Sequence, residues 1–226
     1  MRVTHKKKLI HTTYKMDDTP LEEVSSYPYL GVEISKDLNW ATHINSISKK
    51  ANRMLGLLRR NIFCCTSDVK STAYKALVRP RLEYCNTVWD PHHGTHKTTI
   101  ERVQRKAARF VTGEYRRETS ATALVNSLDW DTLEIRRVKA RLTTIHKETH
   151  GVIPSNIEHL RHRGSHQSRR KNGQHSYNIP DFNKDCLKYS LYPRTIPEWN
   201  LLPDDTRSIP DTDVFKSALD NIDFNI

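Results

Sequence analysis

The hydrophobic pattern of this chain changes once, near residue 39, from a period of two to a period of 3.6. Before that point Leu30, Val32 and Ile34 alternate with small or polar residues, which is the pattern of a half-buried strand. After Trp40, apolar residues recur every three or four positions, which is typical of amphipathic helices. The sequence therefore predicts a mainly α-helical protein with a short β segment at its N-terminus.

The β segment is expected to span residues 1–38. The run Asp17–Pro20 has the composition of a turn, and Tyr14–Asp18 is expected to form the exposed tip of a hairpin. Gly31, which has no side chain, marks a place in a strand where another backbone or a ligand approaches closely. Asn39 suits the N-cap of the helix that follows.

A helical bundle is expected over residues 39–155. Its first helix starts at Trp40, and its second is capped by Thr66 or Ser67 and ended or kinked by Pro80. Gly113 is expected to close the third helix. The remaining boundaries place helices at Lys97–Thr112, Ala121–Ser127 and Asp131 to about His150.

The C-terminal third divides into a basic loop, residues 156–186, and a last segment, residues 187–226. Between Arg161 and Lys171 there are five Lys or Arg residues, no acid and no apolar periodicity. Such a loop is expected to become ordered, if at all, on a phosphate backbone. The last segment is expected to contain one short helix around Val214, Phe215 and Leu219.

Positive charge is the strongest indication of function. The 37 Lys and Arg residues exceed the 26 acids, which gives a formal net charge of +11 and a pI near 9.6. A nucleic acid is the natural partner for such a chain, and an inert basic surface is the alternative. Three helices place basic residues opposite their apolar faces, and the loop adds more. The predicted nucleic-acid-binding residues are Lys49, Arg53, Arg60, Arg102, Arg105, Lys106, Arg109, Arg136, Arg137, Arg141, Arg169, Arg170 and Lys171.

Other classes of protein receive less support from the sequence. No stretch has the roughly 20 apolar residues of a membrane helix, and the basic N-terminus lacks the apolar core of a secretory signal. Four irregularly spaced cysteines do not make a disulfide framework. A nuclear or cytoplasmic location is therefore expected.

Metal binding and catalysis also receive little support. Cys64, Cys65, Cys85, His92, His93 and His96 are zinc-ligand types, but the paired spacings of a zinc finger are absent. The expected roles are a small core residue for Cys85 and turn residues for the histidines. No nucleophile elbow or phosphate-binding glycine loop occurs, so no catalytic, cofactor or metal residue is predicted. Core packing is favoured over nucleotide stacking for Trp40, Trp89, Trp130 and Trp199.

A series of short blocks occurs in a fixed order along the chain. They include Tyr29-Leu30-Gly31, Trp40 with His43-Ile44, Arg79-Pro80 with Leu82-Glu83-Tyr84, Trp89-Asp90-Pro91, Val103-Gln104-Arg105, Arg136-Arg137, Pro193-Arg194-Thr195-Ile196, Trp199-Asn200 and Leu202-Pro203. In this order the blocks resemble the end of the palm, the thumb and the C-terminal segment of LINE-type, jockey-like non-LTR retrotransposon reverse transcriptases.

The resemblance implies a fragment of an RNA-directed DNA polymerase. Tyr29, Leu30 and Gly31 would be the segment that supports the primer end. The parent enzyme would use Mg²⁺ held by a Tyr-x-Asp-Asp hairpin, but Tyr14-Lys15-Met16-Asp17-Asp18 has one residue too many and no upstream carboxylate to accompany it. The fingers and endonuclease parts are also absent, so this chain is expected not to be an enzyme.

Two functions remain open from the sequence. The first is residual, non-specific binding of an RNA/DNA template–primer duplex. The alternative is a non-catalytic interaction module that docks onto upstream polymerase domains or another protein through Leu30, Val32 and Ile34.

Overall fold

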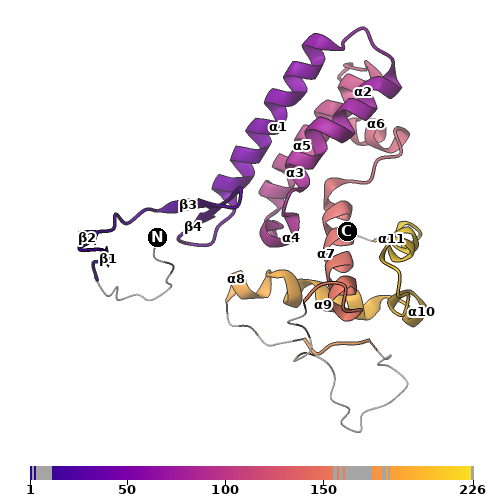
Figure 1. The fold of residues 1–226 in the computed structure, drawn as a ribbon. Helices are drawn as coiled ribbons and strands as arrows, with labels where there is room; N and C mark the ends of the chain where they lie inside the picture. Colours follow the sequence, from indigo (N-terminus) through magenta and orange to yellow (C-terminus); the bar gives the residue numbers. More distant parts are fainter. Residues whose placement is uncertain are drawn as a thin grey trace.

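The computed structural model describes residues 1, 3, 12–154, 157, 160, 175–179, 182 and 184–224. The prediction of a mainly α-helical protein is confirmed, and two small antiparallel sheets precede the helices (Figure 1). Within the described ranges, none of the helices combines the length and the apolar content that crossing a bilayer requires.

The two sheets are hairpins with two-residue turns. The first pairs β1 (Lys15–Met16) with β2 (Thr19–Pro20), and its turn residues Asp17 and Asp18 have φ of 47° and 62°. These residues are exposed, so the predicted hairpin tip is confirmed. The second hairpin pairs β3 (Ser26–Tyr29) with β4 (Val32–Ser35).

Leu30 and Gly31 form the turn of the second hairpin, with φ of 46° and 82°. Positive φ at both central residues is the signature of a type I′ turn. The prediction that Leu30 shares a strand face with Val32 and Ile34 is therefore wrong. Gly31 is needed for the turn and for space, because a Cβ there would lie 3.3 Å from Cε1 of Tyr84.

Substitution of Gly31 by alanine should destabilise the protein by about 1–2 kcal/mol, since alanine pays a steric cost at positive φ. Gly94→Ala is the matched control, because a Cβ at Gly94 meets nothing within 4 Å and its φ lies outside the left-handed region. Urea unfolding of the two variants makes the comparison. An equal change in both would show that the turn imposes no special requirement.

The β3–β4 hairpin packs on the start of α1 (Ala41–Asn61). Val32 is buried in the core, and the backbone N–H of Glu33 donates to Nδ1 of His43 at 3.1 Å. At the turn of the hairpin, the hydroxyl of Tyr84 donates to the carbonyl oxygen of Leu30 at 2.9 Å. The N-cap of α1 is Trp40 and not Asn39 as predicted, but the side-chain oxygen of Asn39 accepts the N–H of Ala41, the first residue of the helix.

The contact between His43 and the backbone of Glu33 should make the free energy of unfolding depend on pH. Burial holds the pKa of His43 below its ordinary value, with repulsion from Lys50 adding to the effect. The unfolded chain therefore binds the proton first as pH falls, and the free energy of unfolding should drop below about pH 6.5, by at most about 1.4 kcal/mol per pH unit for this group.

Urea unfolding at several pH values between 7.5 and 5 would measure the effect. His43→Gln keeps an acceptor for the N–H of Glu33 but cannot titrate, so its stability should vary less steeply with pH. His92, His96 and His146 also have lowered pKa values because of burial, and they should supply the remaining dependence. The same slope in both proteins would exclude His43 as a contributor.

The first hydrophobic core joins the helices of what we call the upper bundle (Figure 1). Pro80 does not end the second helix. A π-helical turn precedes it, and the helix continues beyond it. This helix buries Tyr74, Val78 and Leu82, whereas Val69 and Leu77 are exposed. After α1, the upper bundle contains α2 (Ser67–Ala73), η1 (Tyr74–Val78), α3 (Arg79–Glu83), α4 (Asn86–Trp89), α5 (Gly94–Thr112) and α6 (Ala121–Ser127).

The second core lies in what we call the lower bundle, and the long helix α7 (Leu133–Thr149) contributes to both. Leu133 packs in the upper core, while Val138, Leu142 and Ile145 pack in the lower one. The described remainder of the lower bundle is α8 (Asp185–Lys188), α9 (Leu191–Leu201), α10 (Asp204–Arg207) and α11 (Thr212–Asp220).

The predicted short C-terminal helix is confirmed as α11, but α9 was not predicted. Pro193 and Pro197 lie inside α9, and prolines argue against a helix when only the sequence is read. Packing compensates for them, since Ile196 and Trp199 are fully buried in the lower core.

Candidate nucleic-acid interface

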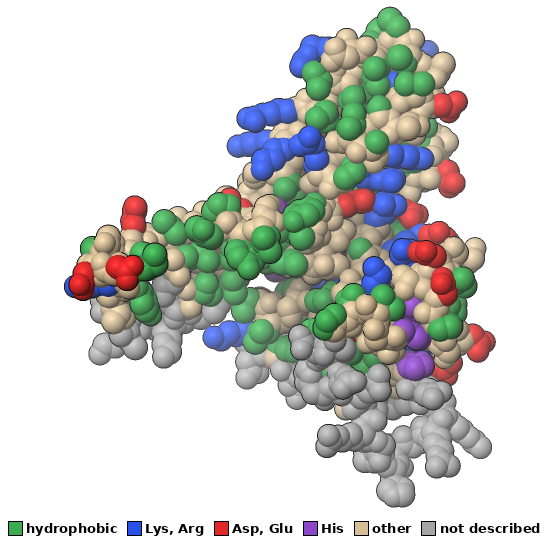
Figure 2. Space-filling model, in the orientation of Figure 1, with side chains coloured by type: hydrophobic (Ala, Val, Ile, Leu, Met, Phe, Trp, Pro, Cys, Tyr) green, Lys and Arg blue, Asp and Glu red, His purple; other side chains and the backbone are tan. Residues whose placement is uncertain are grey.

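The outer surface of α1 is basic, and the helix carries no acid that could neutralise it. The helix carries Lys49, Lys50, Arg53, Arg59 and Arg60 and no acidic residue. Its apolar face is buried against the upper core, so Lys49, Arg53 and Arg60 point outward and are exposed, as predicted. Figure 2 shows Lys and Arg side chains standing out from the flank of the molecule along which α1 runs.

Helix α5 extends this surface from the side. Nζ of Lys106 donates to Oδ1 of Asn52 on α1 at 3.3 Å, and Arg102 lies one helical turn before Lys106. Both side chains are exposed, as predicted. Beside them, α1 forms a shallow groove of about 470 Å³ lined by Lys49, Asn52, Arg53, Gly56 and Arg60. We call Lys49, Arg53, Arg60, Arg102 and Lys106 the α1–α5 basic face.

The length of this face suits a nucleic-acid strand. Lys49 and Arg60 are separated by 11 residues of helix, which is about 16 Å at 1.5 Å per residue. Phosphates of one strand follow each other at about 3.4 Å along a duplex axis, so the face spans about five of them. Flexible Lys and Arg side chains on a rigid helix can contact phosphates without reading bases.

Two other predicted residues of α5 have different surroundings. Arg105 is exposed but lies on the α6–α7 side, in a depression shared with Thr122 and Glu134. Arg109 is half-buried and donates to the carbonyl oxygens of Arg116 at 3.0 Å and Thr119 at 2.8 Å. Arg109 therefore holds the loop after α5 in place.

The predicted basic outer face of α7 is wrong. Its Arg136 is half-buried and forms an ion pair with Glu83 of α3, and Lys139 pairs with Asp131 and Asp220. Helical periodicity placed Arg136 on an open face. Its partner Glu83 is distant in sequence, so spacing along α7 alone could not reveal the pair.

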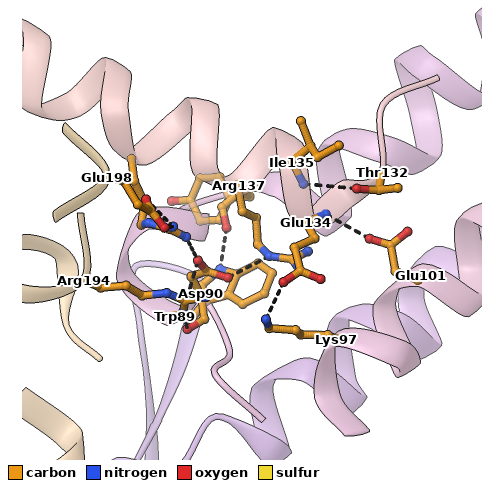
Figure 3. Close-up of polar contacts among 12 residues, drawn as sticks. Trp89, Asp90, Lys97, Glu101, Thr132, Glu134, Ile135, Arg137, Arg194 and Glu198 are labelled. Atoms are coloured by element: carbon orange, nitrogen blue, oxygen red, sulfur yellow. Dashed lines mark hydrogen bonds and ion pairs between the residues drawn. The ribbon is translucent and has the colours of Figure 1, made fainter. Parts of the chain in front are cut away.

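Arg137 and Arg141 are also misassigned, because both are buried in an ionic cluster around Asp90 (Figure 3). The carboxylate of Asp90 accepts from Nε of Arg137 at 2.7 Å and from Arg141, and it forms an ion pair with Arg194 at 3.2 Å. Nη1 of Arg194 donates to the backbone carbonyl oxygen of Asp90 at 3.0 Å. Glu198 of α9 accepts from Arg141 at 2.7 Å. Burial lowers the pKa of both Arg137 and Arg141, and the surrounding carboxylates oppose the shift.

This cluster has a structural role, because it ties together α4, α7 and α9. The same region fixes α7 against α5, as the backbone N–H of Glu134 donates to Glu101 at 2.9 Å and Lys97 pairs with the Glu134 side chain (Figure 3). Oγ1 of Thr132 accepts the N–H of Ile135 and caps α7. The arginines of this cluster are not available to an external phosphate.

The remaining predicted residues fall into two groups. Arg169, Arg170 and Lys171 lie outside the described residues. Tyr29 and Leu30 are exposed at the tip of the hairpin with Gly31, near the start of α1. Their predicted contact with a primer stays a prediction.

Metal ligands do not gather in the part of the chain that the structure describes. No group of three or more His, Cys, Asp or Glu side chains there could hold an ion. Asp17 and Asp18 are exposed at a hairpin tip, so the carboxylate set that Mg²⁺ would need in a polymerase is not assembled by the described residues. The cysteines form no disulfide in the described part of the chain, and Cys85 packs partly against the upper core.

Sequence comparison finds a distant similarity to a polymerase. The chain is similar to a probable RNA-directed DNA polymerase from transposon X-element of Drosophila melanogaster, with 26% identity over 103 residues. The aligned part covers 43% of this chain and 11% of that polymerase. The chain is thus distantly similar to a retrotransposon reverse transcriptase. No protein-family model matches the chain, and no solved structure matches it.

Proposed function

We propose that this chain binds the sugar–phosphate backbone of a template–primer duplex through the α1–α5 basic face, without reading base sequence. The observation that carries the proposal is an acid-free helix of five cations, three of them exposed on one side, with Lys106 and Arg102 of α5 beside it. An RNA/DNA hybrid is the expected ligand, given the distant similarity to an RNA-directed DNA polymerase.

In this proposal the chain corresponds to the end of the palm, the thumb and the C-terminal segment of a jockey-like reverse transcriptase. Its helical upper bundle would hold the duplex, and the hairpin of Tyr29, Leu30 and Gly31 would support the primer end. The proposed role of the chain itself is binding without catalysis, because the described carboxylates do not form a metal site.

Binding to a blunt RNA/DNA hybrid should weaken steeply as salt rises. Contacts from five cations imply a slope of log K against log[salt] of about −4 to −5, at roughly 0.9 per phosphate contact for a duplex. Fluorescence anisotropy between about 50 and 300 mM salt measures this slope. Absence of binding at low salt, or affinity that does not change with salt, would contradict the proposal.

A second candidate function is docking onto another protein. The hairpin exposes Tyr27, Tyr29 and Leu30 at 55%, 60% and 73%, and Tyr84, beside Leu30, is exposed at 55%. Figure 2 shows hydrophobic side chains over this region. Val32 and Ile34 are not part of this surface, because Val32 is buried and Ile34 packs against the upper core.

The docking function predicts self-association of the isolated chain and relief by a supplied upstream polymerase domain. Sedimentation velocity of the chain and of Leu30→Ser would measure it, since serine at an exposed turn position removes apolar surface without opening the core. A monodisperse chain that unfolds cooperatively and is unaffected by Leu30→Ser would count against docking.

A further inference from the structure

A cavity of about 490 Å³ lies where α1 and α5 begin. Its walls come from residues 37–40 before α1, residues 90–96 around the start of α5, and residues 184–190 of the lower bundle. Its size falls within the range of about 300–1,000 Å³ that is typical of small-molecule sites. Figure 2 shows a hollow at this level, between the hairpin and the lower part of the molecule.

The cavity lies in line with the α1–α5 basic face. Asn52 of α1 contacts Lys106 of α5, and farther along α1 Arg59 lies over the ring of Tyr115, which follows the C-terminal end of α5. The two helices therefore run in the same direction from the cavity. Lys49 lies about 13 Å beyond Trp40 along α1, at 1.5 Å per residue. A strand bound along the face can extend its end into the cavity.

Flat side chains dominate the walls of this cavity. The rings of His92 and Tyr189 are stacked, with centroids 4.0 Å apart and planes 2° from parallel. His93 and His96 are in contact with each other beside them. Trp89, Trp130 and Trp199 are buried, as predicted, whereas Trp40 is only partly buried and lines the cavity.

The acids at the cavity do not repel an anion as strongly as their number suggests. Asp90 is neutralised by three arginines, whereas the hydrogen bonds that Asp37 accepts from Ser35 and from the N–H of Asn39 lower its pKa and keep it ionised. Asp185 lines the cavity next to Lys184, together with the three histidines. Neither α1 nor α5 has an acid in its first turn, so their helix dipoles favour negative charge here.

We propose that this cavity binds an unpaired terminal nucleotide of the strand that lies along the α1–α5 basic face. The base stacks against both Trp40 and the His92–Tyr189 pair, and the sugar and phosphate point toward Lys184 and the histidines. The proposal deepens the proposed function and rests on it. It adds a preference for ends with an overhang, which phosphate contacts alone do not give.

The test compares two RNA/DNA hybrids with the full chain, one blunt and one with a two-nucleotide single-stranded overhang. The overhang should lower Kd by about tenfold, because stacking of one base on an aromatic side chain contributes about 1–3 kcal/mol. It should also quench tryptophan fluorescence, since Trp40 is the partly exposed tryptophan. The blunt hybrid should bind without quenching.

Two variants distinguish binding in the cavity from binding along the α1–α5 basic face. Trp40→Phe should abolish quenching and keep the fold, and Tyr189→Ala should remove the overhang preference while the blunt hybrid binds as before. Equal affinity for both hybrids without quenching would overturn the cavity proposal and leave the proposed function standing. If neither hybrid binds, the proposed function fails. Millimolar AMP alone then tests the cavity, and absence of Trp40-dependent quenching by AMP would overturn it as well.

Discussion

Replacement of Asp90 by alanine should lower the free energy of unfolding by about 3–5 kcal/mol, the largest effect expected from a single change in this chain. Asp90 is buried, and its carboxylate forms ion pairs with Arg137, Arg141 and Arg194. Removal of the carboxylate would leave three guanidinium groups near one another without their shared counter-ion. Since a domain of ordinary stability has about 5–15 kcal/mol in total, this change would remove a large share of it.

Urea unfolding followed by circular dichroism would measure this loss. The matched control is Asp220→Ala, which removes an exposed carboxylate paired with Lys139 and should cost about 1 kcal/mol or less. Because Asp90 joins α4 of the upper bundle to α7 and α9, its loss should also broaden the transition. A change no larger than that of the control would show that the cluster does not hold the bundles together.

Simultaneous replacement of Lys49, Arg53 and Arg60 by glutamine should weaken binding of the blunt hybrid about 100-fold or more at 0.1 M salt. Each phosphate contact that is lost removes about one unit of the salt slope, and about tenfold in affinity at that concentration. The three side chains are exposed and outside both cores, so the fold should be retained.

The control removes the same net charge elsewhere. Lys75, Arg81 and Arg117 are also exposed and are not among the five residues of the α1–α5 basic face. Their replacement by glutamine should change affinity only slightly and leave the salt slope nearly unaltered. Equal losses in the two triple variants would mean that net charge alone drives binding, and that the arrangement on α1 and α5 has no particular role.

The helices of the upper bundle could be predicted from local signals. The apolar spacing of α1 and α5, Gly113 at the end of α5 with φ of 73°, and the short α6 all follow from a few neighbouring residues. The exposed cations of α1 follow as well, because a helix that buries one stripe must expose the opposite one. Local periodicity is thus sufficient for secondary structure and for the side of each helix that faces the core.

Contacts between distant segments could not be predicted in the same way. Arg137 and Arg141 have the spacing of an outward face, yet Asp90 and Glu198, which are about fifty residues away on either side, bury them. Leu30 has the spacing of a strand residue, yet it is the first residue of a type I′ turn. In both cases the surroundings of the residue depend on which other residues the folded chain brings close to it.

The sequence by itself therefore determined a mainly helical chain, its strong positive charge and the basic residues of α1. Only the tertiary structure decided which cations remain free, because neutralisation requires an acid within a few ångströms and chain folding sets those distances. It also decided that Trp40, His92 and Tyr189 share one cavity. These residues come from three separate segments, and the side-by-side packing of α1, α5 and the lower bundle brings them together.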